Sequence, residues 1–374
     1  MGTITQLPAD QRRLVASGDF PGGGQGLGNG NALWDNDGIV KTAPTIRALG
    51  RLSGFLLLAA AALMPPAQAG AGELENIFDR SFRLAPHAVQ GYGNPLEAAI
   101  AGVASPEAGR IGVAAVDLSS GRAVSVLGDQ PFPMASTGKI AIVATFLDGV
   151  DKGRWRLDQT FPLMLPVPSG RFSTPVAPVR PGPEFTALEL IDMAIIHSNN
   201  AATDALLAVV GGPRAVNQWI GSAGIAGMRI DRDIATLVRD DGEFDPARTV
   251  DPRDSATPQG MVQLLRGLYE GRWLTTSSRR VLIGAMERCL TGRHRIRAGM
   301  PEGVRVAHKT GTLNNTSSDV GFIHSPDGRV IAVAIYVTGQ GGKSGRDSRI
   351  ATIARAIYDG YQTESSGLRR TASR

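Results

Sequence analysis

Segments with strand-like patterns stand near both ends of the globular part of this chain, and helix-like segments fill the middle. Short apolar runs bounded by turn residues are typical of strands. They occur at residues 111–116, 123–126, 304–307, 320–324 and 330–337. The first two runs are joined by a short turn of Asp, Ser and Gly, which predicts a β-hairpin. A sheet assembled from the two chain ends would carry the middle of the chain as a helical insert.

Between these ends, apolar segments with helical spacing alternate with loops. Residues 162–183 contain seven prolines and no clear period, so we expect a loop there. Residues 230–258 are rich in charge and predict a long surface loop. Apolar residues recur at helical spacing in the segments 74–84, 140–147, 187–196, 201–210, 261–269, 278–290 and 349–358, and residues 363–374 form a polar tail.

Composition narrows the class of protein. The apolar share of 42% is ordinary for a globular chain, and the formal net charge is +5. The basic pairs are spread thinly and have no aromatic residues between them, so we do not expect nucleic-acid binding. A single cysteine, Cys289, excludes an internal disulfide framework and a zinc site made of several thiolates.

The first seventy residues resemble a secretory leader preceded by an extension. Residues 1–39 have little hydrophobic periodicity and are expected to be disordered or a misassigned upstream tail, with translation starting near Val40. Residues 40–69 combine basic residues, an apolar core and a small-x-small cleavage site, which predicts a signal peptide. We therefore expect a periplasmic or secreted protein without a stable membrane span after cleavage. A buried helix or a membrane anchor is the alternative for the apolar core.

The motif Ser136-Thr137-Gly138-Lys139 precedes one of the apolar helices. On a helix, residues three apart share a face, so the Ser136 hydroxyl and the Lys139 amine can meet. Lysine can act as the base that activates a serine if burial or another cation lowers its pKa. The helix N-terminus also favours an oxyanion. The structural alternative is a capping serine beside a solvent-facing lysine.

Two further fragments supply complementary groups. Ser198-Asn199-Asn200 ends one predicted helix and offers a hydroxyl for proton relay and an amide for hydrogen bonding. Lys309-Thr310-Gly311-Thr312 follows a predicted strand and offers a cation and two hydroxyls. Its glycine allows a substrate to approach the backbone closely. Each fragment alone is also compatible with an ordinary turn or helix boundary.

Together and in this order, the three fragments resemble the signature of the penicillin-recognising serine enzymes, in particular the class A β-lactamases. The segment 253–258 resembles the end of that family's omega loop. The resemblance covers roughly residues 74–362. It implies an α/β fold of the α+β sandwich type, in which a five-stranded antiparallel sheet is flanked by terminal helices and lies beside an all-helical lobe.

The resemblance also implies catalytic roles. Ser136 would be the acylated nucleophile, and Lys139 would accept its proton. Ser198 would pass a proton to the leaving nitrogen, assisted by Lys309. The backbone N–H groups of Ser136 and Thr312 would form the oxyanion hole.

Binding and structural roles follow from the same resemblance. Asn200 would hold the amide side chain of the substrate. Lys309, Thr310 and Thr312 would hold its carboxylate, with Gly311 making room beside them. Arg232 and Asp254 would form an ion pair across the neck of the omega loop.

The chain departs from the family in the omega loop. The family carries Glu-x-x-Leu-Asn there, and its Glu and Asn hold the water that hydrolyses the acyl-enzyme. Aligning Arg232 with the family places Ile234 and Val238 at those two positions. Neither apolar side chain can hold or deprotonate water. The loop is longer than the family's, so an inserted acid is a candidate base: Glu243 first, then Asp233, Asp240 and Asp241, although each can be a solvated loop charge.

These residues are compatible with three functions. The first is a hydrolase that opens β-lactam amides through a Ser136 acyl-enzyme. The second is a D,D-peptidase or esterase with the same acylation chemistry, and the third is a penicillin-binding sensor that deacylates slowly. In each, a monomer would act on a small-molecule substrate without a cofactor or a metal. A Ser-His-Asp hydrolase lacks its Gly-x-Ser-x-Gly motif, and the five histidines lack zinc-ligand spacing.

Overall fold

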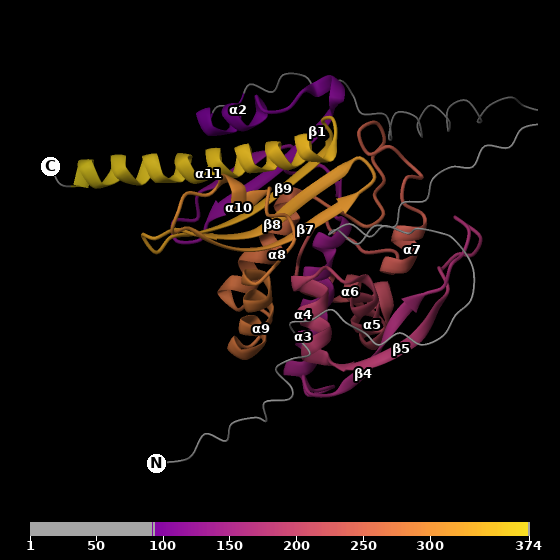
Figure 1. The fold of residues 1–374 in the computed structure, drawn as a ribbon. Coiled ribbons are helices and arrows are strands. Elements are labelled where there is room, and N and C mark those ends of the chain that lie inside the picture. The colour runs from indigo at the N-terminus through magenta and orange to yellow at the C-terminus, as the bar shows by residue number, and fades with distance from the viewer. Residues whose placement is uncertain (1–91, 93, 373–374) are drawn as a thin grey trace, which may run out of the picture.

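The computed structural model describes residues 92 and 94–372, and their centre is a five-stranded antiparallel sheet (Figure 1). The strand order is β2-β1-β9-β8-β7, so strands from the two ends of the described chain lie side by side. This confirms the sheet predicted from the apolar runs. The strands are β1 (Gly109–Asp117), β2 (Ala123–Val126), β7 (Arg305–Leu313), β8 (Thr316–His324) and β9 (Val330–Gly339).

The two faces of the sheet pack against different helices. Side chains along a strand alternate between faces, and in β1 Val113 and Ala114 belong to separate buried clusters. The cluster with Val113 packs against α2 (Pro95–Ala101) and α11 (Lys343–Ala372), which lie along one face in Figure 1. The cluster with Ala114 joins the sheet to the helical lobe on the other face.

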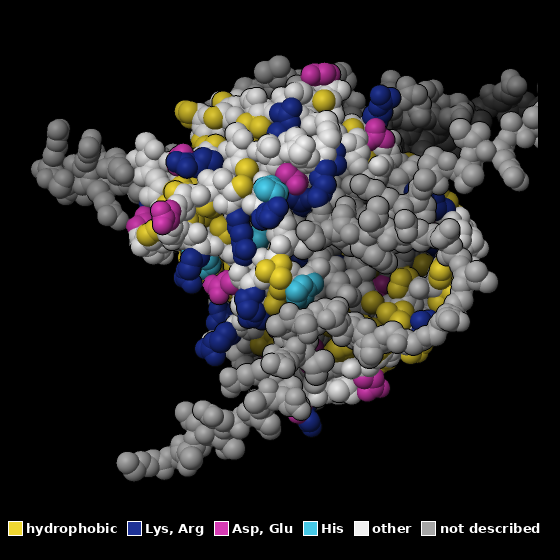
Figure 2. Space-filling model, in the orientation of Figure 1, with side chains coloured by type: hydrophobic (Ala, Val, Ile, Leu, Met, Phe, Trp, Pro, Cys, Tyr) yellow, Lys and Arg dark blue, Asp and Glu magenta, His cyan; other side chains and the backbone are white. Residues whose placement is uncertain are grey.

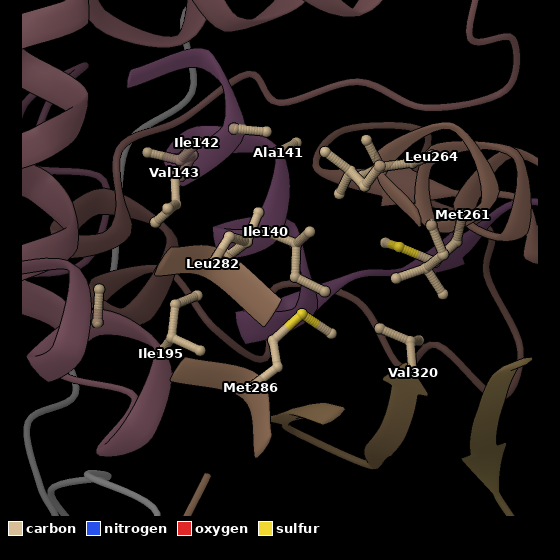
Figure 3. Close-up of a cluster of buried hydrophobic side chains, with 14 of the residues drawn as sticks. Ile140, Ala141, Ile142, Val143, Ile195, Met261, Leu264, Leu282, Met286 and Val320 are labelled. Carbon is tan, nitrogen blue, oxygen red and sulfur yellow. The ribbon is translucent and has the colours of Figure 1, made fainter. Parts of the chain in front are cut away.

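The lobe is built around α3 (Lys139–Asp151), whose residues 139–149 are all buried. A helix that is apolar on every side needs neighbours all round it. Figure 3 shows Ile140 beside Leu282 and Met286 of α9, with Met261 of α8 across the core. The other lobe helices are α4 (Ala187–Ile196), α5 (Asn200–Val210), α6 (Gly212–Ser222), α7 (Ile234–Arg239), α8 (Pro258–Glu270) and α9 (Thr276–Glu287). The short α10 (Ile296–Gly299) instead packs against α11, on the other face of the sheet.

Two expectations about irregular segments were wrong. The proline-rich stretch 162–183 contains most of an antiparallel hairpin formed by β4 (Thr160–Pro166) and β5 (Val179–Thr186). An isolated pair of strands has free edges, where proline costs no ladder hydrogen bond. The stretch 230–258, predicted as a long surface loop, contains the helix α7. Residues 363–372 of the polar tail continue α11, which ends at Ala372.

Several expectations fall outside the described residues: the upstream extension 1–39, the leader pattern 40–69 and the helix predicted at 74–84. Within the described residues, none of the helices combines the length and apolar character needed to cross a membrane. The remaining described elements are the short strands β3 (Phe132–Pro133) and β6 (Ser255–Ala256), which pair with each other, and the 3-10 turns η2 (Pro106–Ala108) and η3 (Ala135–Gly138).

The surface reflects the excess of basic residues. Figure 2 shows Lys and Arg side chains gathered on one part of the face in view, with His and acidic side chains among them. A groove lined by Arg297, Arg305 and Glu287 likewise carries both signs of charge. The basic residues are therefore mixed with acids rather than arranged as a uniform patch.

Candidate active site

Ser136 stands where the sheet meets the lobe, in the turn η3 that leads directly into α3. Ala135 before it has a φ of 50°, which is uncommon for a residue with a side chain. The Ser136 side chain is half-buried, whereas Lys139, the first residue of α3, is fully buried. The alternative of a solvent-facing lysine is therefore wrong.

The buried Lys139 ammonium group is bound by the turn between α4 and α5. Its Nζ donates to the Ser198 carbonyl at 2.6 Å and to Asn200 Oδ1 at 2.7 Å, and lies 3.3 Å from Ser198 Oγ. Ser198 has a φ of 58°, and Asn199 caps α5 by accepting from Ala202 N. The unusual backbone of Ser198 lets its carbonyl and its hydroxyl face the same lysine.

The third fragment reaches the same hydroxyl from the sheet. Lys309 on β7 is fully buried, and its Nζ donates to Ser198 Oγ at 2.8 Å and to the Thr310 carbonyl at 3.0 Å. The Ser198 hydroxyl thus lies between two ammonium groups from separate elements. Residues 139, 198 and 309, far apart in the sequence, form one cluster, and Ser136 precedes its first member by three residues.

This environment lowers the pKa of Lys139 well below its usual value. Burial is the largest cause, because it disfavours the charged form, and the nearby Lys309 cation adds to it. The Asp204 carboxyl acts in the opposite direction. A lysine with a lowered pKa is neutral more often and can accept a proton from a neighbouring hydroxyl.

Gly311 allows β7 to approach the turn that carries Ser136. A Cβ atom at this position would lie 2.5 Å from the Met134 carbonyl oxygen and 3.0 Å from the Ala135 Cβ. β7 is the edge strand of the sheet, and such a strand presents backbone groups outward. The segments that carry Ser136 and Thr312 therefore lie against each other. The oxyanion hole expected from the backbone N–H groups of these two residues stays a prediction.

The hydroxyl groups of Thr310 and Thr312 on β7 form hydrogen bonds with other residues of the protein. The Thr310 hydroxyl shares a 2.6 Å hydrogen bond with Thr291, so its part in binding a carboxylate stays a prediction. Thr312 Oγ1 accepts from Arg295 Nη2 at 2.7 Å. Arg295 is 1% exposed, also donates to the Gly311 carbonyl, and pairs with Asp347.

Two functional candidates were missed in the sequence, Arg295 and Asp204. Arg295 lies in a run of several basic residues, and nothing in that run distinguishes it from its neighbours. Asp204 carries a readable signal: it is an acid inside an apolar helix, four residues after Asn200 and therefore on the same face.

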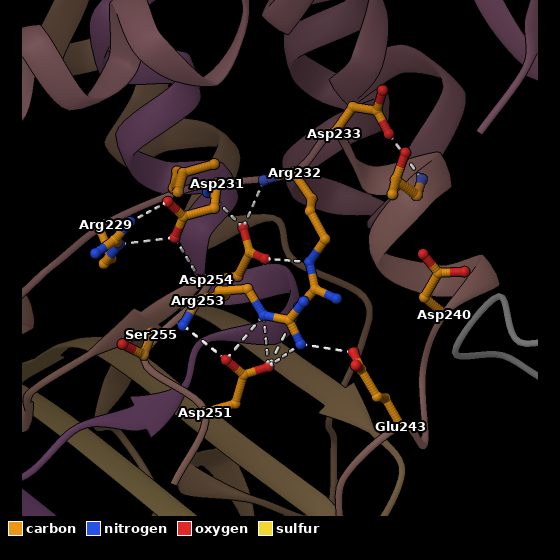
Figure 4. A network of polar contacts seen from close by, with 12 residues as sticks. Arg229, Asp231, Arg232, Asp233, Asp240, Glu243, Asp251, Arg253, Asp254 and Ser255 are labelled. Carbon is orange, nitrogen blue, oxygen red and sulfur yellow. Dashed lines mark hydrogen bonds and ion pairs between the residues drawn. The ribbon is translucent and has the colours of Figure 1, made fainter. Parts of the chain in front are cut away.

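The neck of the omega loop is closed by a network of ion pairs (Figure 4). Arg232 Nε lies 2.6 Å from Asp254 Oδ2, and the other oxygen of Asp254 accepts from the backbone N–H groups of residues 231 and 232. Only 6% of the Asp254 side chain is exposed in this pair. The structure therefore joins the two residues at the two ends of the loop.

The acids proposed as a replacement base are bound elsewhere in the loop. Glu243 Oε2 lies 2.6 Å from Arg253 Nη2, as Figure 4 shows, and none of its described contacts is with the cluster around Ser198. Ile234 is buried and Val238 is partly exposed. Of the other acids, Asp233 caps α7, Asp240 pairs with Arg239, and Asp241 accepts from Asn314 N.

In the part of the chain that the structure describes, no group of His, Cys, Asp and Glu side chains is arranged to hold a metal ion. The site consists instead of a serine, two lysines and a second serine at the junction of a sheet and a helical lobe. This combination of fold and side chains is typical of serine hydrolases.

Comparisons with known proteins agree with this class. The model described as "Beta-lactamase enzyme family" matches residues 95–361. Beta-lactamase CTX-M-25 of Escherichia coli is 30% identical over 272 residues, which cover 72% of this chain and 90% of that protein. Extended-spectrum beta-lactamase PER-1 of Pseudomonas aeruginosa is 30% identical over 247 residues, covering 64% of this chain and 77% of that protein.

Solved structures give the same result. A beta-lactamase from Chitinophaga pinensis DSM 2588 matches with a TM-score of 0.63 and 27% identity, covering 72% of this chain and 100% of that one. The last common ancestor of Gram-negative bacteria (GNCA4) beta-lactamase class A matches with a TM-score of 0.61 and 34% identity over the same shares. The chain belongs to the class A beta-lactamase family, a family of serine hydrolases.

The close approach at Gly311 generates a test of how the site is assembled. Gly311→Ala should destabilise the protein by about 1–3 kcal/mol, because the added methyl group forces β7 away from Met134. Urea unfolding measures the change. Gly221→Ala is the control, since its Cβ would meet open space and should change stability by less than about 1 kcal/mol. Equal effects of the two substitutions would contradict the close-packing argument.

Proposed function

We propose that this protein opens β-lactam amides through an acyl-enzyme on Ser136. The observation that carries the proposal is the convergence of Lys139, Ser198 and Lys309 at the start of α3, three residues along the chain from Ser136. Both lysines are buried, and the pKa of Lys139 is lowered. The three sequence motifs, each a weak indication of function on its own, contribute side chains to one hydrogen-bonded cluster. The curated relatives, by their names, are beta-lactamases, which supports a β-lactam substrate.

The geometry supports a two-step proton transfer during acylation. Neutral Lys139 takes the proton from Ser136 Oγ as that oxygen attacks the carbonyl carbon of the substrate. The N–H groups of Ser136 and Thr312 stabilise the oxyanion. When the carbon–nitrogen bond breaks, the Ser198 hydroxyl gives its proton to the leaving nitrogen and takes one from Lys139, to which it lies within 3.3 Å.

Substrate binding uses the remaining donors. Asn200 Oδ1 is occupied by Lys139, so the side-chain NH₂ group of Asn200 is left for a substrate amide carbonyl. Lys309, Thr310 and Thr312 would hold a substrate carboxylate. Arg295 adds positive charge behind Thr312, since its guanidinium donates to the Thr312 hydroxyl. Because Arg295 is itself paired with Asp347, Lys309 is the main cation proposed for the carboxylate.

Acylation at Ser136 is tested by covalent labelling. Ser136→Ala should abolish labelling by a fluorescent penicillin, because no acyl-enzyme can form without the hydroxyl. Gel fluorescence and a thermal melt measure labelling and folding together. Ser277→Ala, a change at an exposed serine on α9, is the control and should label normally. Labelling that persists on another residue in Ser136→Ala would overturn the assignment.

A second function, slow deacylation in the manner of a penicillin-binding sensor, is favoured by one specific observation. Ile234 and Val238 stand where the family has the Glu and Asn that hold the hydrolytic water, and Glu243 is paired with Arg253. A D,D-peptidase or esterase would use the same acylation groups. Turnover of D-Ala-D-Ala peptides or simple esters distinguishes these activities from β-lactam hydrolysis.

The missing glutamate predicts which step is slow. After mixing with a penicillin, the acyl-enzyme should be visible by intact mass spectrometry, because loss of a general base slows hydrolysis by roughly 10²–10⁴-fold. Glu243→Gln should leave the amount of adduct unchanged, since Arg253 holds that side chain. Fast turnover in the wild type together with adduct in Glu243→Gln would instead identify Glu243 as the base.

We also propose that the enzyme acts outside the cytoplasm. The support is the leader-like pattern at residues 40–69, with its basic flank, apolar core and small-residue cleavage site. N-terminal sequencing of the exported protein should begin near Gly70. A mature protein that retains residues 1–39 would contradict export by this leader.

A further inference from the structure

The free edge of β7 presents backbone groups at every second residue. In an antiparallel pair, alternate residues of a strand bond to the neighbouring strand, and the residues between them direct their N–H and C=O groups to the other side. The Thr310 carbonyl belongs to the free side, where it accepts from Lys309 Nζ at 3.0 Å. Thr312 lies two residues further along β7, so its backbone groups face the same side.

The next donor along this edge, the N–H group of Asn314, is already bound by the omega loop. It donates to the carboxylate of Asp241, at 2.8 Å to Oδ2 and 3.1 Å to Oδ1. The side chain of the following residue, Asn315, donates from Nδ2 to Asp245 Oδ1 at 2.8 Å. Two acids of the omega loop therefore hold the turn between β7 and β8, and one of them occupies the donor that follows Thr312.

The same part of the loop is tied on its other side to the tip of the β4–β5 hairpin, which lies near α7 in Figure 1. The buried Asp240 accepts from Phe172 N at 3.1 Å. Arg239 pairs with Asp240 and donates to the carbonyl and the hydroxyl of Thr174, at 2.8 and 2.9 Å. Residues 239–245, which we call the strap, thus connect the hairpin tip to the β7–β8 turn.

The strap stands beside the segment that carries Ser136. A hollow beneath it is lined by Pro133 and Leu313, among others. Pro133 precedes Ser136 by three residues, and Leu313 directly follows Thr312. A ligand that runs along the free edge of β7 past Thr312 would therefore meet the strap.

We propose that the strap ends the substrate site and confines the enzyme to compounds with a short acyl part, so that β-lactams are accepted and extended peptides are excluded. This inference rests on the proposed function, in which Lys309 holds the substrate carboxylate and the Thr312 N–H binds the carbonyl oxygen. The acyl part then continues toward Asn314. An extended peptide would pair with this edge as an added strand, but the donor that it needs is held by Asp241.

Displacing the strap costs more than one ordinary hydrogen bond. Bonds to a carboxylate are stronger than bonds between neutral groups, and an extended ligand offers only a neutral carbonyl in exchange. Moving Asp241 would also disturb the contacts of Asp240 and Arg239 with the hairpin tip, because the three residues are consecutive. The capped edge is in addition protected from pairing with other chains. Asp240 and Asp241, candidates for a base in the sequence, thus limit the length of the substrate.

The test compares acylation of Ser136 by two penicillins that differ only in the acyl side chain, a phenylacetyl group in one and a tripeptide in the other. Intact mass spectrometry measures both rates. In the wild type the peptidyl penicillin should react about tenfold more slowly, the effect of one or two unmade hydrogen bonds. In Asp241→Ala the ratio of the rates should move about fivefold toward the peptidyl penicillin, because the Asn314 N–H becomes available. A general loss of structure would slow both probes alike and leave the ratio unchanged.

Two variants control for the acceptor and for the charge. Asp241→Asn keeps an oxygen that accepts from the Asn314 N–H and should keep the ratio within about twofold of the wild-type value. Asp158→Ala removes an exposed acid that pairs with Arg156 before β4 and should leave the ratio unchanged. A wild type that reacts equally fast with both penicillins, or an unchanged ratio in Asp241→Ala, would overturn the inference.

Hydrogen exchange tests the strap without any substrate. The N–H groups of Phe172 and Asn314 should exchange slowly in the wild type, and each should lose protection when its own acceptor is removed, in Asp240→Ala or Asp241→Ala. If Asp241→Ala does not fold, the wild-type exchange and the wild-type rate ratio decide. Fast exchange at Asn314 in the folded wild type would reject the strap. Absence of any labelling at Ser136, with Asn314 protected, would reject the proposed function while the strap itself stands.

Discussion

The hydroxyl of Ser198 lies between two buried ammonium groups, and this contact links the helical lobe to the sheet. Lys139 comes from α3 and Lys309 from β7, and both are within hydrogen-bonding distance of the same oxygen. Two like charges without water are unfavourable unless acceptors and opposite charge surround them. Carbonyl oxygens, an amide oxygen and Asp204 provide these. Burial makes the charged form of this cluster unfavourable, and it also lowers the pKa of Lys139. A lysine with a lowered pKa is neutral more often and can therefore act as a base.

The fold brings together the segments that form this cluster, although they are far apart in the sequence. The edge strand β7 can lie against the turn before α3 because Gly311 has no side chain. The left-handed backbone at Ser198 turns two of its oxygens toward one lysine. On the far face of the sheet, α2 and α11 cover the apolar side chains. Two of the unusual backbone conformations, at Ala135 and Ser198, therefore adjoin the reacting groups.

In the omega loop, the residues that anchor the loop differ from the residues expected to contact a hydrolytic water. Its neck is held by Arg232 and Asp254, as in the pattern that the family signature implies, and this network is compatible with a longer loop. The positions that would hold a hydrolytic water carry Ile234 and Val238 instead. A loop can keep its attachment after losing its acid, because ion pairs at the neck do not depend on the side chains that face the substrate. The ion pair at the neck is therefore present, whereas residues 234 and 238 of the loop are apolar.

The sequence by itself determined the sheet, most of the helices and the members of the central cluster. Apolar periodicity is local, and the motifs around Ser136, Ser198 and Lys309 are contiguous, so both can be read without coordinates. It failed at residues 162–183, where prolines suggested a loop although both strands of the hairpin are edges. The contacts of Asp204 and Arg295 emerged only from the tertiary structure, although the sequence already shows Asp204 as an acid inside an apolar helix. Both residues are important because they are buried and because packing brings distant segments and their charges close to them. A local sequence pattern does not show which distant segments come into contact.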